Sequence, residues 1–290
     1  MQCFGAVTDA EMTLKKYVGQ LVRKGLEASV ARRLVGRDEL ADYCETKFVF
    51  GEPERVVTNT IADLEGNPQY KSEYSVEPPF ACEVSDISMF GPGGTVVTND
   101  GTILFESARN LRGDIVERLV YLLRSPKRLP QLLSGYRQLY APWFPGGGYD
   151  FQLAFPVTYP TYAGYYHWVV ECLPKLRTLE RYRDETGKDP VVLLDPDPPS
   201  WMRESVELLT DAEIVERPRS AIRIDRLVLP SHRNHHPDDF NPSPSEYRWL
   251  REQMFDAVGV DDSGGGRRIY ISRADADRRR VTNETAVVEC

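Results

Sequence analysis

The hydrophobic positions of the first 46 residues follow the spacing of short helices. Between residues 9 and 46, apolar side chains recur three or four positions apart, and Asp9 stands where it can cap the first of two or three helices. Between residues 15 and 37 the charged positions are mostly basic, namely Lys15, Lys16, Arg23, Lys24, Arg32, Arg33 and Arg37. Two interpretations are open: a basic amphipathic helix that contacts an anionic membrane surface, and a solvated helix face packed on its own domain.

The pattern changes to short runs of β-branched and aromatic residues between positions 47 and 110. Glycine-rich turns at 91–94 and 99–101 separate these runs, and Asn-Asp-Gly between two of them is typical of a hairpin. This segment therefore predicts a small antiparallel β module. A helix is expected over 111–140, and the Pro- and Gly-rich stretch 142–148 marks a boundary with the next part of the chain.

From residue 151 onward the pattern alternates between strands and helices. Strands are expected at 151–155, 191–194, 214–215, 222–229 and 268–272, and helices at about 165–184, 200–209 and 246–258. Such alternation predicts a doubly wound, mainly parallel sheet. Sheets of this kind bind ligands at the carboxyl ends of their strands.

Composition excludes several classes of protein. The chain has 290 residues, 41% hydrophobic content, a formal net charge of −8 and a pI near 5.2, which suits a soluble globular protein and opposes general nucleic-acid binding. Neither a signal peptide nor an apolar membrane span is visible. The cysteines are Cys3, Cys44, Cys82, Cys172 and Cys290. Their odd number and wide spacing oppose a disulfide framework and a cysteine zinc site, and a reducing cytoplasm is the simplest context.

The first candidate chemistry lies in the predicted helix at 165–184. His167 and Glu171 are four positions apart, so a helix places them on one face, beside the apolar stripe. An imidazole with a carboxylate partner is an acid/base group, and we expect the pair at the mouth of a cleft, partly accessible. The alternative is a capped histidine without catalytic function. Pro174 should kink or restart the helix.

A second candidate site begins where the predicted strand 268–272 ends. Arg273, Arg279 and Arg280 come within a short loop, and Asn283 stands where it can cap the next helix. Guanidinium groups and a helix N-terminus that converge on one loop suit a diphosphate. The alternative is a solvated basic loop.

A third cluster of polar residues lies between the predicted strand at 222–229 and the predicted helix at 246–258. His232, His235, His236, Asp238 and Asp239 could bind a divalent metal, although their spacing matches no helical ligand pair and prolines mark a loop. The sequence has no dinucleotide fingerprint, phosphate-binding P-loop or serine-hydrolase elbow, so those enzyme classes lose their main support.

The first two candidate segments together resemble glycosyltransferase family 61. The resemblance rests on Tyr165, Tyr166, His167, Trp168, Glu171 and Pro174, then on Ser272, Arg273, Arg279, Asn283 and Glu284, in matching order and spacing. Residues 76–110 also look like the leader region of the capsular-polysaccharide-type members, so the resemblance covers roughly 76–290.

The resemblance implies an α/β fold of the GT-B type and an inverting hexosyl- or pentosyl-type transferase. One Rossmann-like acceptor-side half would occupy 146–262, after N-terminal helices (1–46) and a β module with a helix (47–145). Residues 267–290 would begin the donor-side half. The substrates implied are a nucleotide-sugar and a glycan acceptor, in polysaccharide or surface-glycan synthesis, with no cofactor and no metal. His167 and Glu171 would be catalytic, and Arg273, Arg279, Arg280 and Asn283 would bind the donor diphosphate.

This sequence stops inside a predicted helix that has just begun, whereas members of the family continue well beyond that point. The resemblance therefore implies a truncated chain. We therefore expect 267–290 to be loosely packed with exposed apolar side chains, and donor binding to be weak or absent. The alternatives are an inactive remnant that binds a glycan or a partner, and a metal-dependent hydrolase built on the cluster at 232–239. The expected location is cytoplasmic, with a peripheral contact at the inner face of the membrane as the open alternative.

Overall fold

The structure is a computed structural model, and it describes most of the chain from residue 34 onward. The described residues are 34–58, 73–90, 93–104, 106, 149–158, 164–231, 242–259, 270–272, 274–275 and 280–288. Several predicted features lie outside the described residues. They are residues 9–33 of the helical segment predicted over 9–46, the helix predicted at 111–140, the cluster at 232–239, Arg273 and Arg279.

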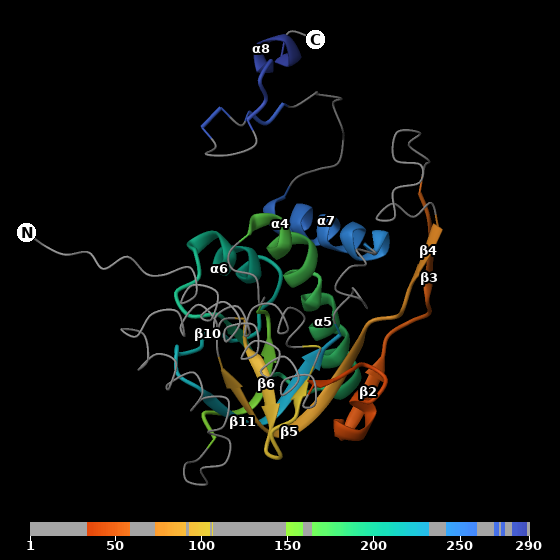
Figure 1. Ribbon diagram of the computed structural model, residues 1–290, viewed down its shortest axis with the longest axis vertical. Helices are drawn as coiled ribbons and strands as arrows, with labels where there is room; N and C mark the ends of the chain where they lie inside the picture. Colours follow the sequence, from red (N-terminus) through yellow and green to blue (C-terminus); the bar gives the residue numbers. More distant parts are fainter. Residues whose placement is uncertain are drawn as a thin grey trace, which may run out of the picture.

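The centre of the described fold is one mixed nine-stranded sheet (Figure 1). Its strand order is β1-β7-β6-β5-β11-β8-β9-β10, and β2 pairs with β5 beside this path. The strands are β1 (Leu34–Val35), β2 (Thr46–Val49), β5 (Phe80–Phe90), β6 (Thr95–Thr98), β7 (Ile103–Leu104), β8 (Phe151–Pro156), β9 (Val191–Leu194), β10 (Ile214–Glu216) and β11 (Ile222–Pro230). A separate hairpin is formed by β3 (Glu54–Val57) and β4 (Glu73–Val76).

The strands β11, β8, β9 and β10 are parallel neighbours, as the alternating pattern predicted. The chain proceeds from β8 to β9 and β10 on one side and then returns to β11 on the other side of β8. The direction of strand order thus reverses beside β8, and this is the position where open α/β sheets bind ligands. All four strands have their carboxyl ends at the same edge of the sheet, which we call the carboxyl edge.

The antiparallel strands belong to this same sheet, which corrects the expectation of a separate antiparallel module at 47–110. Strand β5 pairs antiparallel with β11 from the register Ile222–Met89 to the register Pro230–Ala81. Its other edge pairs with β2 and β6. The apolar pattern predicts that β11 is a buried strand, but a buried strand needs a hydrogen-bonding partner on each edge, and the pattern does not say which strand supplies it. How the chain divides into folding units stays a prediction.

The helices after β8, β9 and β11 cover one face of the sheet. They are α4 (Tyr165–His167), a π-helical turn η6 (Trp168–Cys172), α5 (Lys175–Thr186), α6 (Ser200–Glu207) and α7 (Pro244–Val258). The amide of Leu173 donates to the carbonyl of Trp168, five residues back, at 3.0 Å. Pro174 then precedes the first residue of α5, so the predicted restart of the helix is confirmed.

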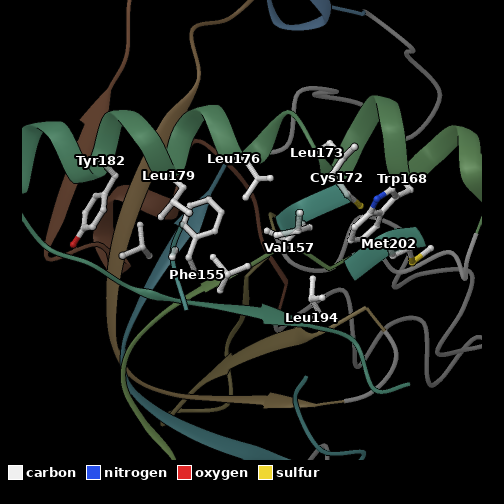
Figure 2. Close-up of a cluster of buried hydrophobic side chains, with 14 of the residues drawn as sticks. Phe155, Val157, Trp168, Cys172, Leu173, Leu176, Leu179, Tyr182, Leu194 and Met202 are labelled. Carbon is white, nitrogen blue, oxygen red and sulfur yellow. The ribbon is translucent and has the colours of Figure 1, made fainter. Parts of the chain in front are cut away.

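Alternate residues of the strands fill two hydrophobic cores, one on each face of the sheet. Phe155 lies in the core under α5, and its neighbour Ala154 lies in the opposite core. Figure 2 shows the core under α5, where side chains of the helix point at the strands. Its members include Val157, Trp168, Leu173, Leu176, Leu179, Tyr182 and Leu194.

Two expectations about the amino-terminal third are wrong within the described residues. Residues 34–46 form β1, a short 3-10 helix (η1, Leu40–Tyr43) and the start of β2 rather than an α-helix. Cys44 and Cys82 form a disulfide, with their Cα atoms 5.6 Å apart, although no disulfide was expected. The pairing of β2 with β5 brings these cysteines together, and a sequence separation of 38 residues gives no sign of it.

The carboxyl-terminal segment differs from the expected strand at 268–272. Residues 270–272 have no regular secondary structure, and the short helix α8 (Glu284–Val288) comes later. As expected, apolar side chains here are exposed, with Ile271 82% exposed and Tyr270 40% exposed. Glu284 accepts hydrogen bonds from the hydroxyls of Tyr270 (2.9 Å) and Ser272 (2.7 Å), so this segment contacts itself.

Candidate active site at the carboxyl edge of the sheet

The candidate site lies where α4 and η6 begin, just beyond the carboxyl end of β8. The thiol of Cys172 donates to the carbonyl of Thr158 at 3.8 Å, which holds η6 against the chain that leaves β8. Because β8 is the strand beside which the strand order reverses, its carboxyl end is the position where such sheets bind ligands.

The sequence-predicted pair is formed in the structure. His167 ends α4, Glu171 lies in η6, and Nδ1 of His167 is 3.1 Å from Oε1 of Glu171. The histidine side chain is 40% exposed and the glutamate side chain 6% exposed. The accessibility expected for His167 is therefore confirmed, but Glu171 is buried. A buried carboxylate that holds Nδ1 fixes the ring orientation, and with the proton on Nδ1 the other ring nitrogen is a proton acceptor.

The groups around this pair have perturbed acidities. Partial burial raises the pKa of Tyr166, and the neighbouring Glu171 raises it further, so this hydroxyl keeps its proton at neutral pH. Burial raises the pKa of the Cys172 thiol to about 12, which makes this thiol an unsuitable nucleophile. Burial also raises the pKa of Tyr247, with contributions from Tyr166 and Glu171, which places α7 beside the same site.

A chain of hydrogen bonds connects the strand ends beneath the pair. Nζ of the buried Lys175 donates to the carbonyl of Thr158 at 2.8 Å, and the Thr158 hydroxyl donates to the carbonyl of Gly93 at 3.0 Å. The amide of Gly93 donates to Oδ1 of Asp195 at 3.1 Å, and the buried Arg217 donates to the same oxygen at 2.5 Å. Residues from the ends of β8, β9 and β10 and from the β5–β6 turn are thus held together.

Sequence reasoning did not select this network. Asp195 comes directly after the predicted strand at 191–194, and Arg217 comes directly after β10, so position after a strand was the available signal. The neighbouring Gly94 has φ +67°, and a Cβ there would lie 3.0 Å from the Thr158 hydroxyl oxygen. A glycine is therefore required at the turn for two reasons, its backbone conformation and the close approach.

The β3–β4 hairpin fixes the start of α7. The carboxylate of Glu54 accepts hydrogen bonds from the hydroxyl of Ser243 (2.6 Å) and from the amide (3.1 Å) and hydroxyl (2.9 Å) of Ser245. A carboxylate at a helix N-terminus stabilises its first amides and its dipole. The Tyr74 hydroxyl donates to the carbonyl of Pro242 at 2.8 Å, so two strands of the hairpin contribute.

Residues 165–290 match the family model Glycosyltransferase 61.

This match indicates a glycosyltransferase at the level of the family. It begins at Tyr165, the first residue of α4, and it includes His167 and Glu171 together with the arginines and asparagine of the second candidate segment. The resemblance expected for residues 76–164 lies outside the matched range. Comparisons with curated proteins and with solved structures gave no match.

The second segment of the glycosyltransferase 61 match is described only in part. Arg280 and Asn283 are exposed, and the carbonyl of Asn283 accepts from the amide of Val287 at 3.3 Å, so Asn283 lies directly before α8. Figure 1 shows α8 apart from α4 and α7, so the helix that follows Asn283 does not lie beside the helix that carries His167.

The described ranges contain neither a metal site nor a membrane span of the usual kinds. In that part of the chain, no group of three His, Cys, Asp or Glu side chains could hold a metal ion. No described helix has the length and apolar character needed to cross a bilayer.

Proposed function

We propose that this protein transfers a sugar from a nucleotide-sugar donor to a hydroxyl of a glycan acceptor, with inversion at the anomeric carbon. The observation that carries the proposal is the His167–Glu171 pair, 3.1 Å apart, with the histidine partly exposed and the glutamate buried, inside the segment that matches glycosyltransferase 61. The pair stands beside the strand at which the sheet reverses its order, where α/β sheets bind ligands.

In the proposed reaction His167 removes the proton from the acceptor hydroxyl as that oxygen attacks the anomeric carbon. The new carbon–oxygen bond forms on the face opposite the diphosphate, and the bond to the diphosphate breaks, which inverts the configuration. Glu171 keeps the imidazole oriented and stabilises the imidazolium that results. The leaving nucleoside diphosphate carries the negative charge away.

The donor side of the proposal rests on the second segment of the match. Arg273, Arg279 and Arg280 would neutralise the diphosphate, and Asn283 would present the start of α8 to it. The proposed arrangement is that of a GT-B transferase whose donor-side half would begin near residue 267 and which would require no metal. A peripheral membrane contact through the basic residues before 46 belongs to the same proposal.

The test is turnover of a panel of nucleotide-sugars, measured as released nucleoside diphosphate, with wild type, His167→Gln and Glu171→Gln. General-base catalysis predicts a loss of about 10²–10⁴-fold in kcat for His167→Gln. Glu185→Gln is the matched control, because Glu185 is an exposed carboxylate on α5, the next helix along the chain. Full activity in His167→Gln, with thermal unfolding unchanged, would remove His167 from the mechanism.

A calorimetric titration tests the donor site by itself. Wild type and Arg280→Ala are titrated with the same nucleotide-sugars, and submillimolar binding that weakens in the variant supports a donor site in the segment at 270–288. Equal binding by both proteins argues against Arg280 as a diphosphate ligand.

A further inference from the structure

Two large aromatic side chains are exposed in α4, the helix that ends with His167. Tyr165 is 71% exposed and Tyr166 is 53% exposed, and both lie in α4 before His167. The ring of Tyr166 stands edge-on to the His167 ring, with ring centres 5.4 Å apart. An exposed aromatic surface next to acid/base groups is a recognition surface rather than part of the core.

This surface is fixed to the folded core. Trp201, at the start of α6, lies 5.5 Å from Tyr165 between ring centres, with the planes tilted by 53°. Trp201 in turn meets the buried Trp168 edge-on at 6.3 Å, and Nε1 of Trp168 donates to the Ser205 hydroxyl at 2.8 Å. The two-ring surface of Tyr165 and Trp201, which we call the aromatic platform, is therefore held by packing between α4, η6 and α6.

We propose that the aromatic platform binds a pyranose ring of the acceptor glycan and presents its neighbouring hydroxyl to His167. A pyranose ring has apolar C–H faces and a rim of hydroxyls, which suits a surface made of aromatic faces with polar tips. Stacking fixes the plane of the sugar, and the tyrosine hydroxyls and the His167–Glu171 pair meet the hydroxyl rim. This assignment rests on the proposed transferase function and specifies its acceptor.

The charge of the site separates this occupant from the donor. The ionic partner of His167 is the carboxylate of Glu171, which repels an anion such as a nucleoside diphosphate. The buried Lys175 donates its hydrogen bond to the carbonyl of Thr158. A neutral sugar has no such repulsion, so the platform fits the acceptor.

The proposal is tested by binding measurements in the absence of donor. Cellohexaose, maltohexaose and chitohexaose are titrated into wild type, Tyr165→Ser and Tyr165→Phe, with tryptophan fluorescence and calorimetry as readouts. At least one saccharide should bind wild type, Tyr165→Ser should weaken it about tenfold, and Tyr165→Phe should retain it because the stacking face is kept. Leu208→Ala, which shortens a 44% exposed side chain next to the end of α6, is the control and should bind as wild type does.

Several outcomes would overturn the platform. These are no binding of any of the three saccharides by wild type, equal binding by Tyr165→Ser, or a change in sedimentation of Tyr165→Ser that reveals a self-association surface.

The assay also separates this inference from the transferase proposal. If wild type transfers sugar and Tyr165→Ser leaves the acceptor KM unchanged, the platform is wrong and the transferase stands. If saccharide binding depends on Tyr165 but His167→Gln has no effect on turnover, the platform stands and the catalytic proposal falls.

Discussion

Replacing Asp195 by Asn should destabilise the carboxyl edge of the sheet by removing one charge. The Arg217 side chain is 1% exposed, and it donates to Asp195 Oδ1 at 2.5 Å, where the Gly93 amide also donates. A buried guanidinium opposite a neutral amide loses Coulomb energy that water cannot replace. Breaking a fully buried ion pair costs about 3–5 kcal/mol. Asp195 is itself 30% exposed, and Asn keeps an acceptor oxygen, so we expect about 2 kcal/mol for Asp195→Asn.

The chain contains a matched control for this experiment. Asp197 and Arg219 have the same residue types, the same sequence separation and the same 2.5 Å contact, but their side chains are 73% and 74% exposed. The positive φ of Asp197 is tolerated by Asn, so Asp197→Asn introduces no backbone strain. Solvent screens an exposed pair, and Asp197→Asn should leave the urea midpoint unchanged.

The assay is urea unfolding at neutral pH, followed by tryptophan fluorescence and circular dichroism. Asp195→Asn should lower the midpoint without changing the slope, because the surface exposed on unfolding is the same. If Asp195→Asn and Asp197→Asn shift the midpoint equally, burial does not govern the strength of these pairs and the reasoning is refuted. An unfolded Asp195→Asn protein would show that about 2 kcal/mol is an underestimate.

Three further predictions concern other parts of the fold. Glu83 is buried, and although burial alone raises its pKa, hydrogen bonds from Lys188 and Tyr182 lower it below its ordinary value. The ionised Glu83 carboxylate therefore stabilises the fold above its unfolded pKa near 4.5, and this stabilisation is lost as pH falls from there through the lower folded pKa. Glu83→Gln should flatten the acid side of a curve of unfolding free energy against pH. Leu176→Ala, at a side chain 2% exposed in the core under α5, should cost about 2–5 kcal/mol in urea unfolding. A cost near zero would contradict the packing of α5. Gly164→Ala would place a Cβ 3.3 Å from Cδ2 of His167, so turnover should fall while the melting temperature is kept, and unchanged turnover would show that the ring position is not critical.

Local pattern was sufficient for the regular elements of the parallel half. The strands β8, β9, β10 and β11 and the helices α5, α6 and α7 lie within a few residues of their predicted ranges. The hydrophobic periods of two residues in strands and 3.6 residues in helices can be recognised from residues that are close together in the sequence. The restart of the helix at Pro174 results from the missing amide hydrogen of proline. The pairing of His167 with Glu171 was predictable for the same reason, since four residues on a helix are one turn apart.

The tertiary structure decided the contacts between residues that are distant in the chain. The pairing of β5 with β11, which merges the antiparallel and parallel strands, and the Cys44–Cys82 disulfide depend on which strand edges meet. Residues 270–272 carry the alternating pattern of a strand but have no described strand partner, and they are not a strand. The sequence determines what each segment can become, because periodicity and chain stereochemistry are local. The fold decides which segments become neighbours, because a strand edge or an ion pair such as Asp195–Arg217 is stabilised only when its distant partner arrives.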